Sequence, residues 1–184
     1  MTFRQMAVLT LNLIIGGANG FPGSAYGQEV APSEYQMKAA FLYNFAKFVE
    51  WPPAVLPVGA PLVIGVLGND PFDGALDKTI LNKNIEGHPL AVRRIQSLEE
   101  AKTCHVLFIS SSEKKRWPEI SQALAESSVL TVSENWDHFT ESGGMIYFFM
   151  DDRRVCFDIN VEAARRASLK ISSKLMLLRK KPPV

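Results

Sequence analysis

The residues best suited to bind a metal ion in this sequence are its three histidines and two cysteines. His88, His105 and His138 are scattered along the chain, and only Cys104 and His105 are adjacent. Successive side chains on a strand point to opposite faces of the sheet, so Cys104 and His105 would not converge on one ion. We therefore expect no metal site and no required cofactor.

A glycine-containing segment, GVLGND at residues 65–70, follows an apolar run in the position where α/β folds bind phosphate. It contains Gly65, Gly68, Asn69 and Asp70 but lacks the third glycine of the dinucleotide-binding G-x-G-x-x-G pattern. The interpretation that we favour is a tight turn leading into a helix capped by Asp70. The alternative is a loop that binds a small ligand, as in a periplasmic receptor.

The two cysteines, Cys104 and Cys156, are the candidates for redox chemistry. They could be bridged in an oxidising compartment, but only if their α-carbons lie within about 7 Å. The alternative is that Cys156, between Val155 and Phe157 in a predicted strand, is a packed small side chain. The sequence leaves both arrangements open, with the bridge slightly less favoured.

No combination of residues predicts catalysis. The serines at 110–112 follow a strand and are typical of a helix cap, and Asp151 with Asp152 is typical of a turn. A nucleophile with a matching base is not evident, so we expect no catalytic residue and no enzyme.

The first 27 residues have the features of a secretory signal peptide. Arg4 precedes an apolar stretch from Met6 to Ile15, and residues 25–27 form a small-x-small cleavage site. Cleavage would remove one of the 20 basic residues and no acidic one, which leaves 19 of each sign in residues 28–184. This balance argues against a nucleic-acid partner. The sequence thus predicts a single domain over residues 28–184 that works in the periplasm.

Periodicity predicts the elements that position these residues. A helix over about 34–50 begins at a capping box formed by Ser33 and Gln36 and ends before two prolines. Strands are predicted at 61–68, 88–95, 105–110 and 128–134, with helices at 70–81 and about 117–125 and a short helix or turn at 97–104. Residues 145–150 and 155–159 are predicted to form an antiparallel hairpin, followed by short helices at 160–167 and 172–180.

The fold class predicted from this order is α/β. We expect a single compact domain with a mixed, mostly parallel sheet, helices on both faces and the antiparallel hairpin near the C-terminus.

The first predicted helix is apolar around about two thirds of its circumference. One stripe contains Met37, Phe41, Phe45 and Phe48, and the second contains Tyr35, Ala39, Leu42, Ala46 and Val49. A helix lying on one sheet needs one such stripe, so something must cover the second. The C-terminal helix, through Leu175, Met176 and Leu178, is one candidate.

Three segments, KAAFLYNFAKFVEWP, LGNDPF and AARRASLKISSKL, occur in this order along the chain. With the predicted signal peptide, they make the chain resemble the YfiR family of small periplasmic proteins from about Tyr35 to Leu178. The resemblance implies a compact α/β domain that is dimeric in known relatives. The best-understood member binds the periplasmic sensor domain of a membrane diguanylate cyclase and holds that enzyme inactive. An outer-membrane lipoprotein can relieve this inhibition by sequestering the inhibitor.

Under this resemblance, we expect the chain to repress a diguanylate cyclase and so to lower cyclic-di-GMP signalling and biofilm formation. A small-ligand receptor, or a sensory adaptor for another signalling protein, is the alternative function. The residues expected to contact a dimer mate or partner are Leu42, Tyr43, Ala46 and Val49.

The resemblance also bears on the cysteines. Family members often have a cysteine near the position of Gly65 that can bridge to the one matching Cys104. Glycine removes that partner here, so Cys104 is either free or paired with Cys156.

Overall fold

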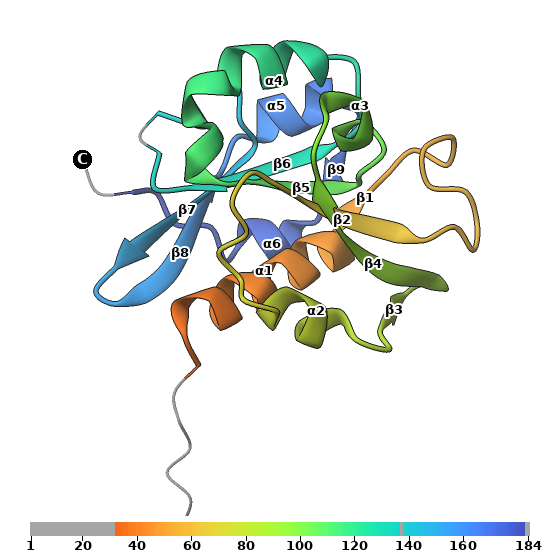
Figure 1. The fold of residues 1–184 in the computed structure, drawn as a ribbon, viewed down its shortest axis with the longest axis horizontal. Coiled ribbons are helices and arrows are strands. Elements are labelled where there is room, and N and C mark those ends of the chain that lie inside the picture. Colours follow the sequence, from red (N-terminus) through yellow and green to blue (C-terminus); the bar gives the residue numbers. More distant parts are fainter. Residues whose placement is uncertain (1–31, 137, 183–184) are drawn as a thin grey trace, which may run out of the picture. The chain divides into compact units, whose positions relative to one another are not determined.

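The computed structural model of the protein describes residues 32–136 and 138–182, which fold as one mixed α/β domain (Figure 1). The predicted signal peptide lies outside the described residues. Helix α1, Glu34–Phe48, begins the domain with the predicted capping box. The Ser33 N–H donates to Gln36 Oε1 at 2.7 Å, and the Gln36 N–H donates to Ser33 Oγ at 3.3 Å.

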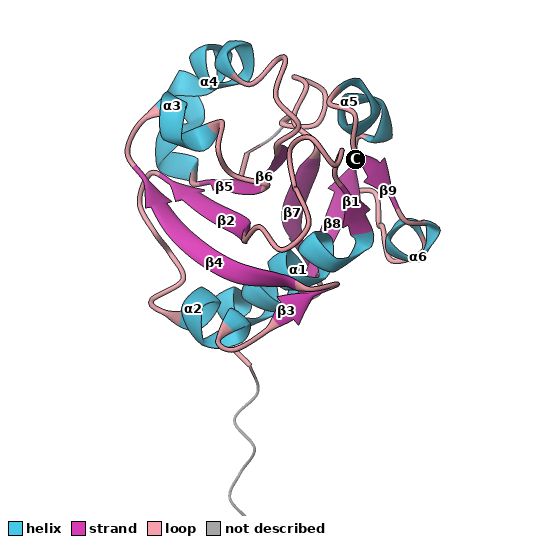
Figure 2. Ribbon diagram, turned by 90° about the vertical axis from the view of Figure 1, so that its right-hand side faces the viewer, coloured by secondary structure: helices cyan, strands magenta, loops and turns pink. Residues whose placement is uncertain are grey.

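Seven strands form the main sheet, in the order β3-β4-β2-β5-β6-β7-β8. Their bounds are Asn84–Ile85 (β3), His88–Ile95 (β4), Leu62–Leu67 (β2), Val106–Ile109 (β5), Leu130–Glu134 (β6), Ile146–Asp151 (β7) and Arg154–Ile159 (β8). Strands β4, β2, β5, β6 and β7 are parallel, and antiparallel β3 and β8 form the two edges (Figure 2). This order confirms the mostly parallel sheet and the C-terminal hairpin.

Helices lie on both faces of the sheet because its central strands are apolar on both sides. On β2, Ile64 and Val66 belong to the core under α1 and α2, whereas Val63 and Leu67 belong to a second core under α3 and α4 (Figure 1). The remaining elements are α2 (Ala75–Ile80), α3 (Leu98–Ala101), a 3₁₀ helix η1 (Ser111–Arg116), α4 (Trp117–Ala123), α5 (Val161–Arg166), α6 (Ser173–Met176), and a separate antiparallel pair of β1 (Val49–Glu50) and β9 (Lys170–Ile171).

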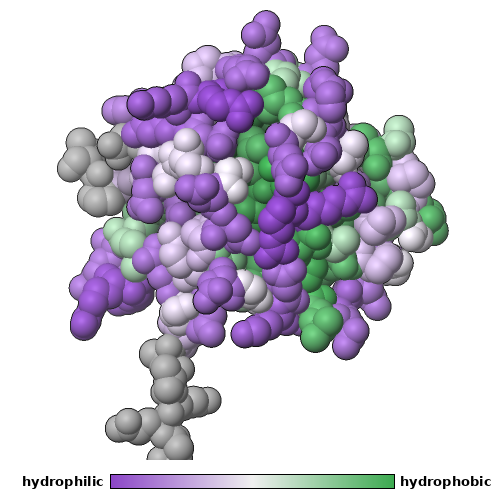
Figure 3. Space-filling model, viewed as in Figure 1, coloured by the Kyte–Doolittle hydropathy of each residue, from purple (hydrophilic) through white to green (hydrophobic). Residues whose placement is uncertain are grey.

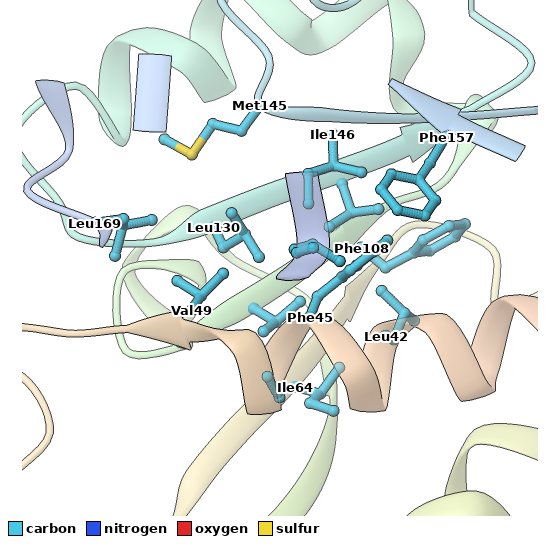
Figure 4. Close-up of a cluster of buried hydrophobic side chains, with 14 of the residues drawn as sticks. Leu42, Phe45, Val49, Ile64, Phe108, Leu130, Met145, Ile146, Phe157 and Leu169 are labelled. Carbon is cyan, nitrogen blue, oxygen red and sulfur yellow. The ribbon is translucent and has the colours of Figure 1, made fainter. Parts of the chain in front are cut away.

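The chain itself covers both apolar stripes of α1. Phe45 stacks on Phe148 of β7 and meets the edge of Phe157 of β8, with ring centroids 5.5 and 5.1 Å apart. Leu42, on the second stripe, is fully buried in the same core, which also includes Leu175 of α6 (Figure 4). The C-terminal helix α6 therefore covers part of the second stripe of α1, which was one of the alternatives expected from the sequence.

Several predicted helix boundaries differ from the structure, and the helix predicted at 172–180 spans only Ser173–Met176. Helix α1 ends at Phe48 because Val49 is already extended and pairs with Ile171. The helix predicted to start at Asp70 starts only at Ala75, since Asp73 and Gly74 have φ values of 47° and 74°, which break a right-handed helix. Asp70 instead accepts a hydrogen bond from the Phe72 N–H at 2.8 Å and so closes a turn.

Candidate functional site

A groove of about 970 Å³ lies at the carboxyl end of α1. Its walls are the end of α1 with β1, the loop between β1 and β2, the β3–β4 turn and the start of α6. The lining residues are Tyr43, Ala46, Lys47, Phe48, Val49, Glu50, Trp51, Pro53, Leu56, Pro57, Val58, Leu62, Asn84, Ile85, Glu86, His88, Ser172 and Lys174. Hydrophobic residues alternate with more polar ones at the right of Figure 3, where the β1–β2 loop lies. Fully exposed Val58 on this loop adds an apolar side chain to a groove whose lining is otherwise mixed in polarity.

Three of the four residues expected to contact a partner line this groove. Ala46 and Val49 are only 1% and 5% exposed and form its floor, whereas Tyr43 is partly exposed on its wall. Leu42 is 0% exposed and does not line the groove. Helical periodicity placed Leu42 on the same apolar stripe as Ala46 and Val49, but at Leu42 the stripe faces the chain's own core.

The rim of the groove combines aromatic rings with charges that have no internal partner. The ammonium of Lys83 lies 4.5 Å from the ring centroid of Tyr43, and that of Lys47 lies 5.6 Å from the ring centroid of Phe48. Within the described parts of the chain, neither lysine forms an ion pair, nor do Lys174, Glu50 and Glu86. Such charges remain available to a bound partner.

The segment predicted as a turn or ligand loop is occupied by internal contacts. Gly65 is inside the buried strand β2 rather than in a loop. Gly68 has φ +88°, and a Cβ there would lie 2.5 Å from Ser112 Oγ, which accepts the Asn69 N–H at 3.1 Å. The groove lies at the other end of β2, where Leu62 is part of its lining. Residues 68–70 of the segment thus form the turn that follows β2 on the way to α2, and this turn contacts η1 through Ser112.

Asp70 takes part in an ion-pair network on the surface. Arg94 of β4 donates to Asp70 Oδ2 at 2.9 Å and to both carboxylate oxygens of Asp77 at 2.7 and 2.6 Å. The hydrogen bond from Arg94 lowers the pKa of Asp77. The network ties the loop after β2, and α2, to strand β4.

Cys104 and Cys156 are both free. Cys104 immediately precedes β5 and Cys156 lies on β8, three strands away in the sheet order. Adjacent strands are spaced by about 4.8 Å, so the two residues are separated by about 14 Å, twice the span of a disulfide. Burial raises the pKa of the Cys104 thiol to about 11, which keeps it protonated and unreactive at neutral pH.

A buried polar cluster, not expected from any sequence motif, joins the start of α1 to the end of β6. Lys38 and Glu134 are 1% and 2% exposed and form an ion pair, and Lys38 also pairs with Glu34. The Tyr35 hydroxyl donates to Glu134 Oε1 at 3.1 Å. Burial, with the negative charge of Glu134, raises the pKa of Tyr35 to about 12, so the phenol remains a donor. The i, i+4 spacing of Glu34 and Lys38 is the feature of the sequence that could have indicated this ion pair.

Metal and membrane sites were also sought over the residues that the structure describes. No group of three or more histidine, cysteine, aspartate or glutamate side chains is placed to hold a metal ion there. No helix in the same residues has the length and hydropathy required to span a bilayer.

The fold and the groove together define the class of protein: an α/β domain suited to binding another molecule in an open groove lined by aromatic side chains. The comparison with protein families makes the assignment more specific. The chain belongs to the YfiR/HmsC-like family, whose model matches residues 35–179. No curated protein matches the chain. Membership of this family supports a regulatory role in diguanylate cyclase signalling rather than a catalytic one.

Proposed function

We propose that this chain acts in the periplasm, where it binds the sensor domain of an inner-membrane diguanylate cyclase and represses the enzyme. The observation that carries this proposal is the family match over residues 35–179, which runs from the first turn of α1 to beyond α6. The regulator binds the inactive conformation of the sensor more tightly than the active one and so shifts the population. Repression lowers cyclic-di-GMP signalling and biofilm formation.

The groove is the surface that we propose for this contact. Tyr43, Ala46 and Val49 line it, and Val58 on the β1–β2 loop is fully exposed. Aromatic and apolar side chains at the centre, surrounded by unpaired charges, are features of protein–protein interfaces. The rim charges, Lys47, Lys174, Glu50 and Glu86, would then set the orientation of the partner.

The proposal also includes how the cyclase is released from the regulator and in which oligomeric state the regulator acts. An outer-membrane lipoprotein that sequesters the regulator would free the cyclase. We propose a homodimer as the functional form, as in known relatives of the family.

The contact can be tested by calorimetric titration of residues 28–184 against the periplasmic sensor domain of a diguanylate cyclase from the same genome. Saturable binding is expected for the unchanged chain. Val58→Asp is expected to weaken binding at least tenfold, because an interface that covers Val58 would bury the new charge. Since Val58 is 102% exposed, the variant should keep the melting temperature of the unchanged chain.

Met150→Asp is the matched control. Met150 is an exposed apolar residue on β7, 42% accessible, and it does not line the groove. Its substitution should change the dissociation constant less than twofold. Absence of binding to every such sensor domain would refute the function, and equal losses in the two variants would refute the groove as the contact surface.

A further inference from the structure

The loop that joins β1 to β2, residues 52–60, is built from short local turns. The N–H groups of Val55 and Leu56 donate to the Pro52 carbonyl at 2.9 and 3.2 Å, and the Ala60 N–H donates to the Pro57 carbonyl at 2.9 Å. Val55 and Val58 are 40% and 102% exposed, although the loop also forms a wall of the groove. The loop is therefore a unit with its own hydrogen bonds.

Two histidines connect this loop to the sheet. The Val55 carbonyl lies 3.3 Å from His105 Nε2, and the Ala60 carbonyl lies 2.8 Å from His88 Nδ1. Across the described chain, these are the hydrogen bonds that residues 52–60 make with segments outside the loop. The two imidazole rings are thus the polar attachments of the loop to the sheet, and Leu56 adds an apolar contact with the core.

The contacts of His105 fix which nitrogen carries the proton. Nδ1 accepts the Val63 N–H at 3.0 Å, so the proton is on Nε2, which donates to the Val55 carbonyl. A second proton would go on Nδ1 and would face the Val63 N–H, donor against donor. His105 is only 6% exposed beneath the loop, so the charged ring would also lack solvation. The closed loop therefore selects the neutral ring.

Among the residues that the structure describes, no acidic group is found to balance a positive charge on His105. Trp51 meets its ring edge-on with centroids 5.9 Å apart, the backbone of Val63 lies on the β2 side, and Cys104 is its protonated neighbour. The charged or titratable groups that act on it are His88 and Arg93, both of which oppose protonation. Burial, with these two groups, lowers the pKa of His105.

His88 holds the other end of the loop by a contact of a different kind. Its Nδ1 faces a carbonyl oxygen, which only accepts, so this nitrogen donates to Ala60 and no donor opposes it. The Ala60 end of the loop should therefore stay attached when the Val55 end is released.

The indole of Trp51 adds a reason for the loop to open. Its Nε1–H is buried and has no acceptor in the part of the chain that the structure describes, and Trp51 lines the groove. An unpaired buried donor is destabilising, because it has given up its hydrogen bonds with water without replacing them. Displacement of the loop would expose this N–H to water and remove this destabilisation.

From these contacts we infer that residues 52–60 form a lid over the groove, attached at Ala60, which opens when His105 takes up a proton. In the open state the ring is in water and titrates near its ordinary pKa of about 6.5. In the closed state it resists protonation, so a fall in pH below about 6.5 favours the open state. The lid covers the groove that is proposed above as the contact surface, but its opening depends only on residues of this chain and needs no partner.

The test is amide hydrogen exchange of residues 28–184, measured by NMR at pH 7.5 and 5.5 and corrected for the intrinsic exchange rates. The Val63 amide is the reporter because its acceptor is His105 Nδ1. A ring that titrates near its ordinary pKa in the open state and stays neutral in the closed state should raise the opening constant about tenfold between the two pH values. The Phe108 amide, in the middle of the sheet, should keep its protection, which separates lid opening from global unfolding.

His105→Gln is the decisive variant. Its amide can accept from the Val63 N–H and donate to the Val55 carbonyl, as neutral histidine does, but it does not titrate. Val63 protection in this variant should be independent of pH, whereas His88→Gln should retain the tenfold change. Constant Val63 protection in the unchanged chain, or the same pH response in His105→Gln, would overturn the inference. Because no partner is present, this result stands apart from that of the binding test.

Discussion

Lys38 shows how a single charged residue can be kept inside an apolar core. Its ammonium is paired with Glu134 in the interior and with Glu34 at the protein surface, and the Tyr35 hydroxyl donates to the second oxygen of Glu134. A buried ion pair of this kind adds little net stability, but removal of one partner leaves an uncompensated charge. The cluster therefore fixes the start of α1 against the end of β6.

Lys38→Met should destabilise the domain by about 3–5 kcal/mol in urea unfolding, because Glu134 would lose its buried cation. Lys47→Met, on the same helix at an exposed position, should change the free energy of unfolding by only about 0.5 kcal/mol or less. The double variant Lys38→Met with Glu134→Gln should recover most of the loss. Equal effects of Lys38→Met and Lys47→Met would contradict the assigned role of the buried pair.

Residue patterns predicted the candidate contact surface only in part. Ala46 and Val49, on the second stripe of α1, line the groove together with Tyr43, and their contact with a partner remains a prediction. Leu42 has the same periodicity but is covered by the core. Periodicity defines which side chains share a face, whereas what covers each part of the face depends on segments distant in the sequence.

At the level of elements, the contact between β2 and the start of β5 explains the glycine at position 65. A Cβ at Gly65 would lie 2.5 Å from Cys104 Sγ and 2.9 Å from Ile95 Cγ1. Both distances are too short for an ordinary contact, so a larger residue would displace its neighbours. The two segments are close enough at this point for a sulfur–sulfur bond to replace the clash.

Gly65→Cys is accordingly expected to form a disulfide with Cys104 under oxidising conditions. Titration of thiols in denaturant should then give one free thiol, from Cys156, whereas Gly65→Cys with Cys104→Ala should give two. Closing a loop of this length stabilises a fold by on the order of 2–4 kcal/mol, so reduction should lower the melting temperature of the variant. Three free thiols after oxidation would show that β2 and Cys104 are not adjacent as described.

The main strands were predictable because they are buried on both faces and appear as continuous apolar runs, as in residues 62–67 and 106–109. The two-residue strands β1, β3 and β9 were not, since two residues carry no periodicity and pair only through the tertiary fold. The start of α2 was misplaced because an aspartate before proline suggested a cap, while Asp73 and Gly74 adopt left-handed conformations.

At the scale of the whole molecule, the candidate site is a product of topology. The groove brings together residues 43–58, 84–88 and 172–174, which no local sequence pattern relates. His88, on β4, lines the groove, and His105, before β5, contacts the loop that forms one wall; the sequence predicted both only as scattered histidines that do not share a metal. The sequence could therefore indicate a regulatory role, through the family resemblance, but not the presence of this groove.

The measurement that tests the central claim most directly is cyclic-di-GMP synthesis by a full-length diguanylate cyclase from the same genome, reconstituted in vesicles with its sensor domain outward and GTP inside. Addition of residues 28–184 to the outside should lower the rate of synthesis in a saturable manner. Val58→Asp should require at least tenfold more protein for the same repression, and Met150→Asp should act as the unchanged chain does. An unchanged or increased rate with every such cyclase would contradict the account of this protein as a periplasmic repressor.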